Sequence, residues 1–464
     1  MTSYTRQVAD IATSLKLSDV PLDVVLRAKA LILDGLGCAL FSADLKWTNI
    51  LAGVVDRLEP KGGTASIWGR RAKASATNAA LVNGAMIQGF ELDDAHIGAA
   101  LHSCSIVLPA AFAAAEMMGA DKVDGAKLLL AIIAGLEFGP RVGICMRGEQ
   151  MSNNGWHSGA IVAPFPAAIA AGIMLGLNSD QMYHALGIAG TQAGGLMAVQ
   201  YGSMVKRIQH GKGAQSGLYG ALLAADGFTG IEDIFEEKYG GFCTTFSHST
   251  DQFDLSALVD NFGTTWELMR CSIKFYAAKM NNHATINAIE ELINEEGLKA
   301  EDVEAIQVAV VQSVVKQCGW SPYVPKGETA AQLHMGFCIA MRLIEGEVFV
   351  DQMVEENIAR PDLVALANRV TVVRSVAREQ KGTNYRYGSD VEVTLKSGRV
   401  LKKTVDFPAG SNLRPPTAEQ MERKFRRLAS QTLPPKKIAK VEKIVWGLDR
   451  ETSVTPLIKL MQGR

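Results

Sequence analysis

The stretch MSNNGWHSGAIVAPFPAAIAAGIMLGLNS, residues 151–179, contains no Asp, Glu, Lys or Arg. Residues 95–115 and 181–205 also lack all four of these residue types. Such runs are long enough to cross a membrane, but Pro164 and Pro166 interrupt the first one, and no clusters of Lys and Arg flank them, as membrane insertion would favour. The runs are rich in Ala and Gly, whose small side chains let helix axes approach closely. They therefore predict buried helices in a tightly packed core.

Amphipathic helices are expected around this core, because apolar residues recur at helical spacing in several other segments. These segments are residues 22–40, 78–90, 285–296 and 329–344. A further helix is predicted over residues 417–430, in a region (411–443) with nine Lys or Arg residues against three Glu residues. Charge on one face is typical of a solvated helix, so we expect this one to lie at the surface.

Strand patterns occur only in the second half of the chain. Val and Ile dominate residues 303–312 and 369–373, and residues 391–395 and 400–405 alternate in polarity around Ser397-Gly398. The sequence therefore predicts a mainly α protein with a large all-helical domain and a smaller α+β domain. The expected boundaries are residues 1–265 with 411–464 for the all-helical domain and residues 266–410 for the α+β domain.

The overall composition excludes several functional classes. The chain has 464 residues, of which 20% are charged, and its net charge is −1. A neutral chain has no long-range field that would attract nucleic acid or an anionic membrane, so neither is expected as a partner. The first 16 residues mix charges and lack a continuous apolar run, which argues against a signal peptide and predicts a cytoplasmic protein. Seven scattered Cys residues without a C-x-x-C pair make disulfides and zinc sites unexpected.

Common cofactor and nucleophile motifs are absent from the sequence. Residues 211–213 (GKG) lack the Ser or Thr that follows Lys in a P-loop. Residues 155–159 (GWHSG) place Ser one position too late for a nucleophile elbow. No G-x-G-x-x-G motif connects a strand to a helix. We therefore expect no organic cofactor.

Instead, a set of ionisable residues lies in or next to the charge-poor segments. The set consists of Asp93, Asp94, His96, His102, His157, Lys206, Arg207, His210, Lys274 and His283. Burial of cationic groups in an apolar shell is costly unless an anion compensates their charge. If these side chains meet in one site, that site is suited to bind a small polycarboxylate.

These residues also have structural interpretations. Asp93 or Asp94 fits a helix cap, and His157 fits a core histidine that is satisfied by hydrogen bonds. Lys206 fits a surface ion pair, and Lys274 taken alone fits a solvated position. A metal site is a further alternative, because oxygen and nitrogen ligands of this kind suit a divalent ion. Its ligands would be Asp93, Asp94, His96 and His102; we favour the interpretation without a metal.

Five short motifs carry a further signal. They are ELDD at residues 91–94, LHS at 101–103, NGWH at 154–157, GSMVKRIQHG at 202–211 and IKFY at 273–276. Together they resemble the MmgE/PrpD family, which includes 2-methylcitrate dehydratases, cis-aconitate decarboxylases and an iminodisuccinate epimerase. The resemblance runs along nearly the whole chain, from residues 27–35 to 448–450. Within the family, the sequence resembles the fungal cis-aconitate decarboxylases most.

The resemblance implies a large all-helical domain, a smaller α+β lid domain, a homodimer, and a cofactor-free active site between the domains. It implies that the family's active-site residues correspond to Asp93, His102, His157, Lys206 and Lys274. The family's active-site tyrosine corresponds to Phe337, in the segment AQLHMGF at residues 331–337. Because a phenyl ring cannot donate or relay a proton, decarboxylation of cis-aconitate by the family route would need a substitute. The available groups are Tyr276, Tyr323 and His334.

The residue types fit this chemistry independently. Dehydration and decarboxylation both need proton transfer, for which His is suited near pH 7, and both need cations that hold the carboxylates that stay. We assign His102 and His157 to proton transfer, Lys206 and Lys274 to carboxylate binding, and Asp93 to orienting a neighbour. The expected further substrate-binding residues are Asp94, His96, Arg207, His210, His283 and Phe337.

The leading prediction is therefore a cofactor-independent lyase that acts on a small di- or tricarboxylic acid by dehydration or decarboxylation. An epimerase or isomerase acting on a related acid is the first alternative. The second is a carboxylate-binding homologue that has lost catalysis, which the Phe337 difference permits.

Overall fold

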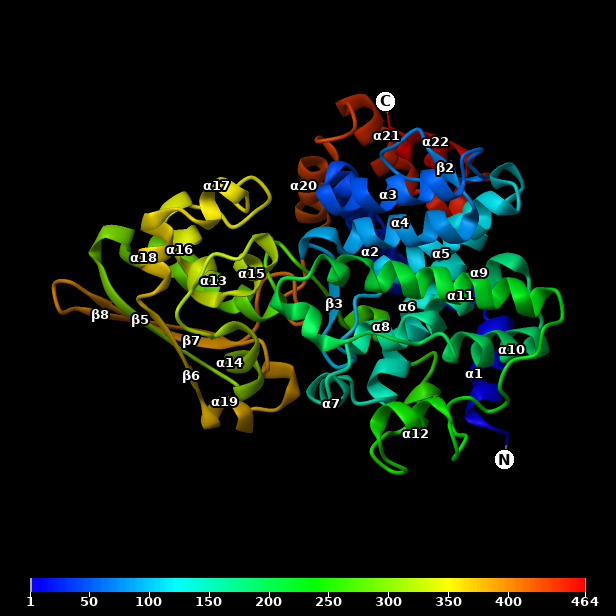
Figure 1. Ribbon diagram of the computed structural model, residues 1–464, viewed down its shortest axis with the longest axis horizontal. Helices are drawn as coiled ribbons and strands as arrows, with labels where there is room; N and C mark the ends of the chain where they lie inside the picture. The colour runs from blue at the N-terminus through cyan, green and yellow to red at the C-terminus, as the bar shows by residue number, and fades with distance from the viewer. Residues whose placement is uncertain (1, 464) are drawn as a thin grey trace.

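Helices dominate residues 2–463, the part of the chain that the computed structural model describes: 59% of the structure is helical and 8% is strand. The N-terminal half forms α1 (Tyr4–Ser14), α2 (Leu22–Phe41), α3 (Lys46–Leu58), α4 (Ala76–Ile87), α5 (Cys104–Met117), α6 (Gly125–Cys145), α7 (Gly148–Asn153), α8 (Ser158–Val162), α9 (Pro164–Leu175), α10 (Ser179–Gly190), α11 (Gln209–Ala225) and α12 (Phe242–Ser247). The C-terminal segment returns to the helical core as α20 (Ala418–Ala429) and α21 (Pro435–Trp446), which pack on α2, and α22 (Thr455–Met461), which packs on α21 (Figure 1). We call all of these elements the helical part.

The charge-poor runs form buried helices over most of their length, as α5, α8, α9 and α10, but residues 191–205 of the third run are largely exposed loop and 3-10 turns. Two segments are long and apolar enough to span a membrane by length and composition, Gly125–Cys145 and Ser158–Leu175, and 89% of the most apolar window of each is buried inside the protein. Small residues make this packing possible where α4 crosses α11. A Cβ added to Gly84 would lie 2.6 Å from the Cα of Gly211, so a larger residue at this crossing would push the two helices apart.

The remaining elements form an α+β part, coloured from yellow-green through yellow to orange in Figure 1. Its elements are α13 (His283–Glu296), β5 (Val303–Val310), α14 (Gln312–Cys318), α15 (Glu328–Leu333), α16 (Met335–Glu345), α17 (Glu355–Ile358), α18 (Pro361–Ala367), β6 (Val370–Arg374), α19 (Val376–Gln380), β7 (Ser389–Leu395) and β8 (Val400–Val405). The sheet order is β6-β5-β7-β8, with β5 and β6 parallel and the other pairs antiparallel. The predicted strands are therefore confirmed. Helix α13 packs on β7 and β8.

One predicted helix is wrong. The periodicity over residues 329–344 predicted a single helix, but the structure divides it into α15 and α16 at His334. The backbone of His334 is extended (φ −85°, ψ 115°), and its Nδ1 accepts a hydrogen bond from the Phe337 amide at 3.0 Å. His334 therefore caps α16, a role that apolar periodicity does not reveal.

Two short strands connect the helical part to the α+β part. β3 (Asp94–His96) pairs antiparallel with β4 (Cys271–Ile273), and Asp94 lies opposite Ile273. In this register the preceding Asp93 lies beside the following Lys274, although 181 residues separate them. A second two-stranded sheet, β1 (Ala65–Ser66) with β2 (Lys73–Ala74), lies within the helical part. The domain boundaries at residues 265 and 410 stay predictions.

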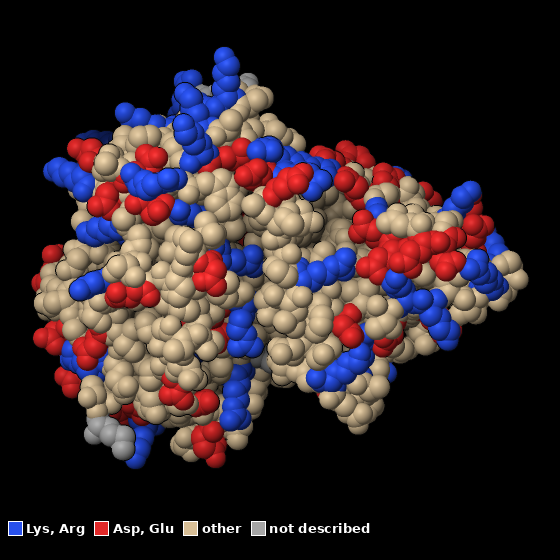
Figure 2. All heavy atoms as spheres, turned by 180° about the vertical axis from the view of Figure 1, so that it is seen from behind, with Lys and Arg blue, Asp and Glu red and all other residues tan. Residues whose placement is uncertain are grey.

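Charges of both signs alternate over the face shown in Figure 2, in line with the net charge of −1. Blue side chains gather where the C-terminal helices lie, and Lys436, Lys440 and Lys443 of α21 are exposed. The surface helix that we expected over residues 417–430 is α20, whose Glu419, Arg423 and Arg426 are exposed. Lys424 of the same helix is buried, so not all of its charge is solvated.

Candidate active site

A cavity of about 100 Å³ lies between the helical part and the α+β part. The polar side chains that line it come from both parts of the molecule. From the helical part these are Glu91, His96, His102, Ser152, His157, Ser158 and Lys206; from β4 onward they are Lys274, Lys279, Asn281, Gln317, Arg386 and Tyr387. We call this space the lysine–histidine cavity. Four of the five residues assigned to catalysis from the sequence line it, and the fifth, Asp93, binds two of the lining residues from behind.

Glu91 is the centre of the cationic cluster. Its backbone is in the left-handed region at φ 56°, an uncommon conformation for a residue other than Gly that ends the turn after α4. Its carboxylate forms ion pairs with Lys206, with Lys274 at 3.4 Å and with Arg207 at 3.5 Å. Burial alone would raise the pKa of Glu91, but these three cations hold it well below its usual range. Glu91 is therefore ionised near pH 7, and it neutralises part of the positive charge around the cavity.

Asp93 connects Lys274 to His102. The Lys274 ammonium donates to the Asp93 carboxylate at 3.1 Å, and His102 Nδ1 lies 3.3 Å from the other carboxylate oxygen. His102 Nδ1 also lies 2.6 Å from the Asp94 carbonyl oxygen. Since both neighbours of Nδ1 are acceptors, Nδ1 carries the hydrogen, and Nε2 is left to exchange a proton. Burial alone would raise the pKa of Asp93, but Lys274 and His102 hold it below its ordinary value.

His157 lies at the N-terminus of α8, as its N-cap residue. Burial, together with the nearby Lys206 and His102, lowers the pKa of His157 to about 3. Its ring is therefore neutral near pH 7, and its buried Nδ1 has no hydrogen-bond partner among the described residues. The ring of His210 lies 5.4 Å from those of both His157 and His102, and its Nδ1 lies 2.9 Å from the Ser105 hydroxyl.

The other residues predicted to bind substrate have structural partners. The Asp94 carboxylate accepts hydrogen bonds from the Ser103 and Cys104 amides, both at 2.9 Å, so it caps the start of α5. His96 lines the cavity, but its Nε2 lies 3.1 Å from the Glu267 carboxylate. With Asp94 and His96 engaged in this way, the four residues of the alternative metal site do not converge. Across residues 2–463, no group of three or more His, Cys, Asp or Glu side chains is arranged to hold a metal ion.

Arg207, His283 and Phe337 lie outside the cavity lining. Arg207 donates to Thr329 at 2.8 Å and to Gln332 at 3.0 Å, so it ties the helical part to α15. His283 Nε2 lies 3.1 Å from the Ala278 carbonyl oxygen. Phe337 is fully buried and stacks on Tyr323 with 4.8 Å between ring centroids. None of the three proposed substitutes for a phenol at Phe337 lines the cavity either; these are Tyr276, Tyr323 and His334.

Family comparisons match both parts of the chain. The model for the MmgE/PrpD N-terminal domain matches residues 6–254, and the model for the MmgE/PrpD C-terminal domain matches residues 276–450. The chain belongs to the MmgE/PrpD family. The prediction made from the five motifs is therefore confirmed.

Similar curated proteins of the MmgE/PrpD type cover almost the whole chain. A cis-aconitate decarboxylase-like protein of Aspergillus oryzae is 36% identical over 99% of this chain and 98% of its own length. The cis-aconitate decarboxylase of Aspergillus terreus is 36% identical over 98% of this chain and 95% of its own length. The human cis-aconitate decarboxylase is 26% identical over 99% of this chain and 95% of its own length. These relatives confirm the predicted enzyme class, a lyase.

Several polar cavity residues of this MmgE/PrpD protein were missing from the sequence-based site, among them Glu91, Lys279, Arg386 and Tyr387. Glu91 stands in the ELDD motif but was not assigned a role. Lys279 follows Lys274 by five residues, in the apolar context Ala277-Ala278-Lys279-Met280, and an isolated Lys in such a context was the available signal. Arg386 and Tyr387 lie in the segment NYRYG at residues 384–388, just before β7. An Arg between two Tyr residues in a Gly-bounded loop is a weaker signal. Tertiary packing brings this loop to the cavity: Thr383 and Arg386 line a pocket together with Gln150 and Asn153 of α7.

Buried histidines make the stability of this MmgE/PrpD protein depend on pH. Burial lowers the pKa of both His157 and His283 to about 3, whereas in the unfolded chain His titrates near 6.5. The unfolded state therefore binds more protons below pH 6.5, and stability is lost as the pH falls. Asp34 and Glu137 act in the opposite direction, since burial raises their pKa values to about 6 and about 7.

We expect His283→Gln to reduce the pH dependence of stability between pH 7 and pH 5. The reduction should be up to about 1.4 kcal/mol per pH unit, the contribution of one proton. Urea unfolding of both proteins across this range measures it. Equal slopes of unfolding free energy against pH would show that His283 is protonated in the folded protein.

Proposed function

We propose that this MmgE/PrpD enzyme is a cofactor-independent decarboxylase that acts on cis-aconitate or a closely similar small tricarboxylate. The observation that carries this proposal is the series of contacts from Lys274 to Asp93 and from Asp93 to His102, at a cavity that Lys279 also lines. In this series His102 is a proton donor that the buried Asp93 carboxylate holds in place. The cavity provides cations for the carboxylates that remain. The 36% identical Aspergillus terreus relatives named cis-aconitate decarboxylase support the choice of this acid among the family's substrates.

The reaction that this geometry suits needs one proton and releases one molecule of carbon dioxide. The bond between the methylene carbon and its carboxylate breaks, and the electron pair forms a new double bond to the central carbon. The old double bond opens, and its CH carbon takes a proton from His102 Nε2. Asp93 stabilises the positive charge on His102 before the transfer. His157, the second histidine of the cavity, is assigned to relay the proton that solvent returns to His102 afterwards.

Lys279 is the cation best placed to hold a substrate carboxylate. The three cations around Glu91 already have a carboxylate partner, and Lys274 has two. The Lys279 ammonium has no hydrogen bond or ion pair within residues 2–463. Burial lowers the pKa of Lys279, and the nearby Arg386 and Lys274 act in the same direction. A bound carboxylate would supply the missing negative charge.

We expect Lys279→Met to raise KM for the tricarboxylate by about tenfold or more, which is the loss of one charge-assisted hydrogen bond in a cavity. The effect on kcat should be smaller, because the contact exists before the reaction as well as during it. Steady-state kinetics measures both values. Lys316→Met is the matched control, since Lys316 is an exposed residue of α14 outside this cavity. An unchanged KM in the Lys279 variant would remove Lys279 from the substrate site.

Dehydration is the second candidate, and the neutral His157 favours it. A neutral imidazole can act as the base that removes a proton next to a carboxylate, while His102 protonates the departing hydroxyl. NMR of the purified protein with cis-aconitate and, separately, with 2-methylcitrate distinguishes the candidates. Carbon dioxide release from cis-aconitate supports the decarboxylase. Water loss from 2-methylcitrate without carbon dioxide release from cis-aconitate supports the dehydratase and contradicts our proposal.

A further inference from the structure

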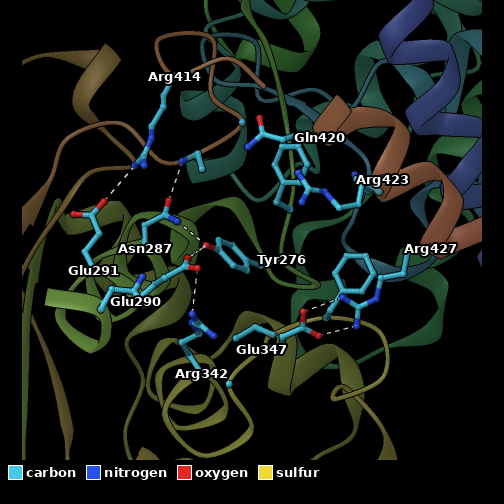
Figure 3. Close-up of a pocket in the computed structure, with 18 of the residues that line it drawn as sticks. Tyr276, Asn287, Glu290, Glu291, Arg342, Glu347, Arg414, Gln420, Arg423 and Arg427 are labelled. Carbon is cyan, nitrogen blue, oxygen red and sulfur yellow. Dashed lines mark hydrogen bonds and ion pairs between the residues drawn. The ribbon is translucent and has the colours of Figure 1, made fainter. Parts of the chain in front are cut away.

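A second cavity, of about 760 Å³, opens between α20 of the helical part and α13 and α16 of the α+β part (Figure 3). Its volume lies within the range of small-molecule sites. The side chains that line it are five cations, three carboxylates, three aromatic rings and several amides. The cations are Arg342, Arg414, Arg423, Lys424 and Arg427, and the carboxylates are Glu290, Glu291 and Glu347. We call this space the arginine cavity.

Four of the five cations in the arginine cavity already have a carboxylate partner. Arg342 pairs with Glu290 at 3.1 Å, and Arg427 pairs with Glu347 at 2.7 Å. Lys424 pairs with the buried Asp34 at 2.5 Å. The remaining pair is long: Arg414 lies 3.5 Å from Glu291, and its side chain is 50% exposed.

Arg423 is the exception among the five cations. It has no ion pair or hydrogen bond to its side chain within the described residues. In Figure 3 its side chain extends from α20 toward the cavity beside Gln420 of the same helix, and Arg414 lies on the opposite side of the view, on the neighbouring loop. The Nε of Arg342, on another wall of the cavity, is buried without a hydrogen-bond acceptor. The cavity thus presents the exposed guanidinium of Arg423 without a protein partner among the described residues, whereas the Arg342 Nε is buried beneath the cavity wall.

We propose that the arginine cavity is a second ligand site, which binds a small anion carrying a phosphate or carboxylate group. The anion would accept hydrogen bonds from Arg423 and from Arg414, whose long, half-exposed ion pair leaves it able to turn. Guanidinium groups bind both kinds of anion through paired hydrogen bonds. The amide of Gln420 and the ring of Phe275 supply further contacts for the rest of the ligand.

Two structural connections link the arginine cavity to the lysine–histidine cavity. Phe275 and Tyr276 line the former and directly follow Lys274, which lines the latter. On the helical side, the Lys424 ammonium donates to the Leu92 carbonyl oxygen at 2.6 Å. Leu92 lies between Glu91 and Asp93, the two carboxylates that hold the active-site lysines. A ligand that moves Lys424 or residues 275–276 would therefore act on both carboxylates.

Isothermal titration calorimetry of the full chain with inorganic pyrophosphate, and separately with succinate, tests the site. We expect saturable binding of at least one probe, and the preferred probe assigns the ligand as a phosphate or a carboxylate. Arg423→Gln should weaken this binding about tenfold or more, the loss of a charge-assisted hydrogen bond. Arg426→Gln is the matched control, because Arg426 lies on the same helix but pairs with Glu442 away from the cavity. It should bind the probe as the unaltered protein does.

Three outcomes would overturn the second site. The first is no saturable binding of either probe, and the second is equal binding by the unaltered protein and Arg423→Gln. The third is binding that Lys279→Met weakens and Arg423→Gln does not, which would place the probe in the lysine–histidine cavity.

The coupling has its own test and rests on the proposed function. Saturating probe should change KM for cis-aconitate by about fivefold or more, within the usual range of allosteric coupling. Arg423→Gln should abolish that change. Binding without any change in KM would overturn the coupling, while failure of the enzyme to convert cis-aconitate would contradict the proposed function and leave the calorimetric result standing.

Discussion

His157→Ala should lower kcat by about 10²- to 10⁴-fold, the usual contribution of a positioned acid or base, and should leave the protein folded. His157 lines the cavity with His102 and Lys206, so its loss removes a group that we propose to take part in proton transfer. Its ring is neutral and its Nδ1 has no hydrogen-bond partner among residues 2–463. Truncation therefore leaves no buried charge or donor without a partner, which is the usual cause of large destabilisation.

Steady-state kinetics and urea unfolding together measure the effect of His157→Ala. His184→Ala is the matched control, because His184 lies on α10 outside the cavity. It should retain turnover. A His157→Ala protein that is folded and turns over at the unaltered rate would exclude His157 from the reaction.

Lys274→Met should abolish turnover and also destabilise the protein by about 3–5 kcal/mol, the effect of breaking a buried ion pair from one side. Lys274 is only 1% exposed and contacts both Glu91 and Asp93. Burial alone would lower the pKa of Lys274, but these two carboxylates raise it above its ordinary value. Removal of the ammonium leaves Asp93 buried beside Glu91 with less compensating charge.

A second variant separates the two effects of Lys274. Lys274→Met combined with Asp93→Asn removes one charge of each sign, so it should recover part of the stability measured by urea unfolding. It should not recover turnover, since His102 loses its carboxylate partner as well. A double variant that is no more stable than Lys274→Met alone would show that the Lys274–Asp93 pair does not account for the loss.

Local sequence patterns predicted much of this fold. Apolar periodicity predicted α2, α4 and α13, and alternation around Ser397-Gly398 predicted the β7–β8 hairpin. The break at His334 could not be predicted in this way, because a cap depends on one hydrogen bond and not on periodicity. The position of Lys424 was also missed, since its partner Asp34 lies 390 residues earlier in the chain.

The site was predictable where residues share a motif and less so where the fold brings them together. Asp93, His102, Lys206 and Lys274 were selected because charge is scarce around them, and the β3–β4 register and the turn at Glu91 explain why they meet. The interpretation of Asp94 as a helix cap agrees with the two backbone amides that donate to its carboxylate. Lys279 carries no motif of its own, and only the packing of the α+β part against the helical part shows that it faces the cavity.

Decarboxylation of labelled cis-aconitate in D₂O tests the central claim most directly. The label is ¹³C in the carboxylate attached to the methylene carbon, and the full chain is the catalyst. We expect one molecule of ¹³CO₂ per turnover and one deuterium on the carbon that was the unsaturated CH, because His102 takes its proton from solvent. Retention of the label in an acid that has only gained or lost water, or only exchanged hydrogen, would contradict the decarboxylase assignment.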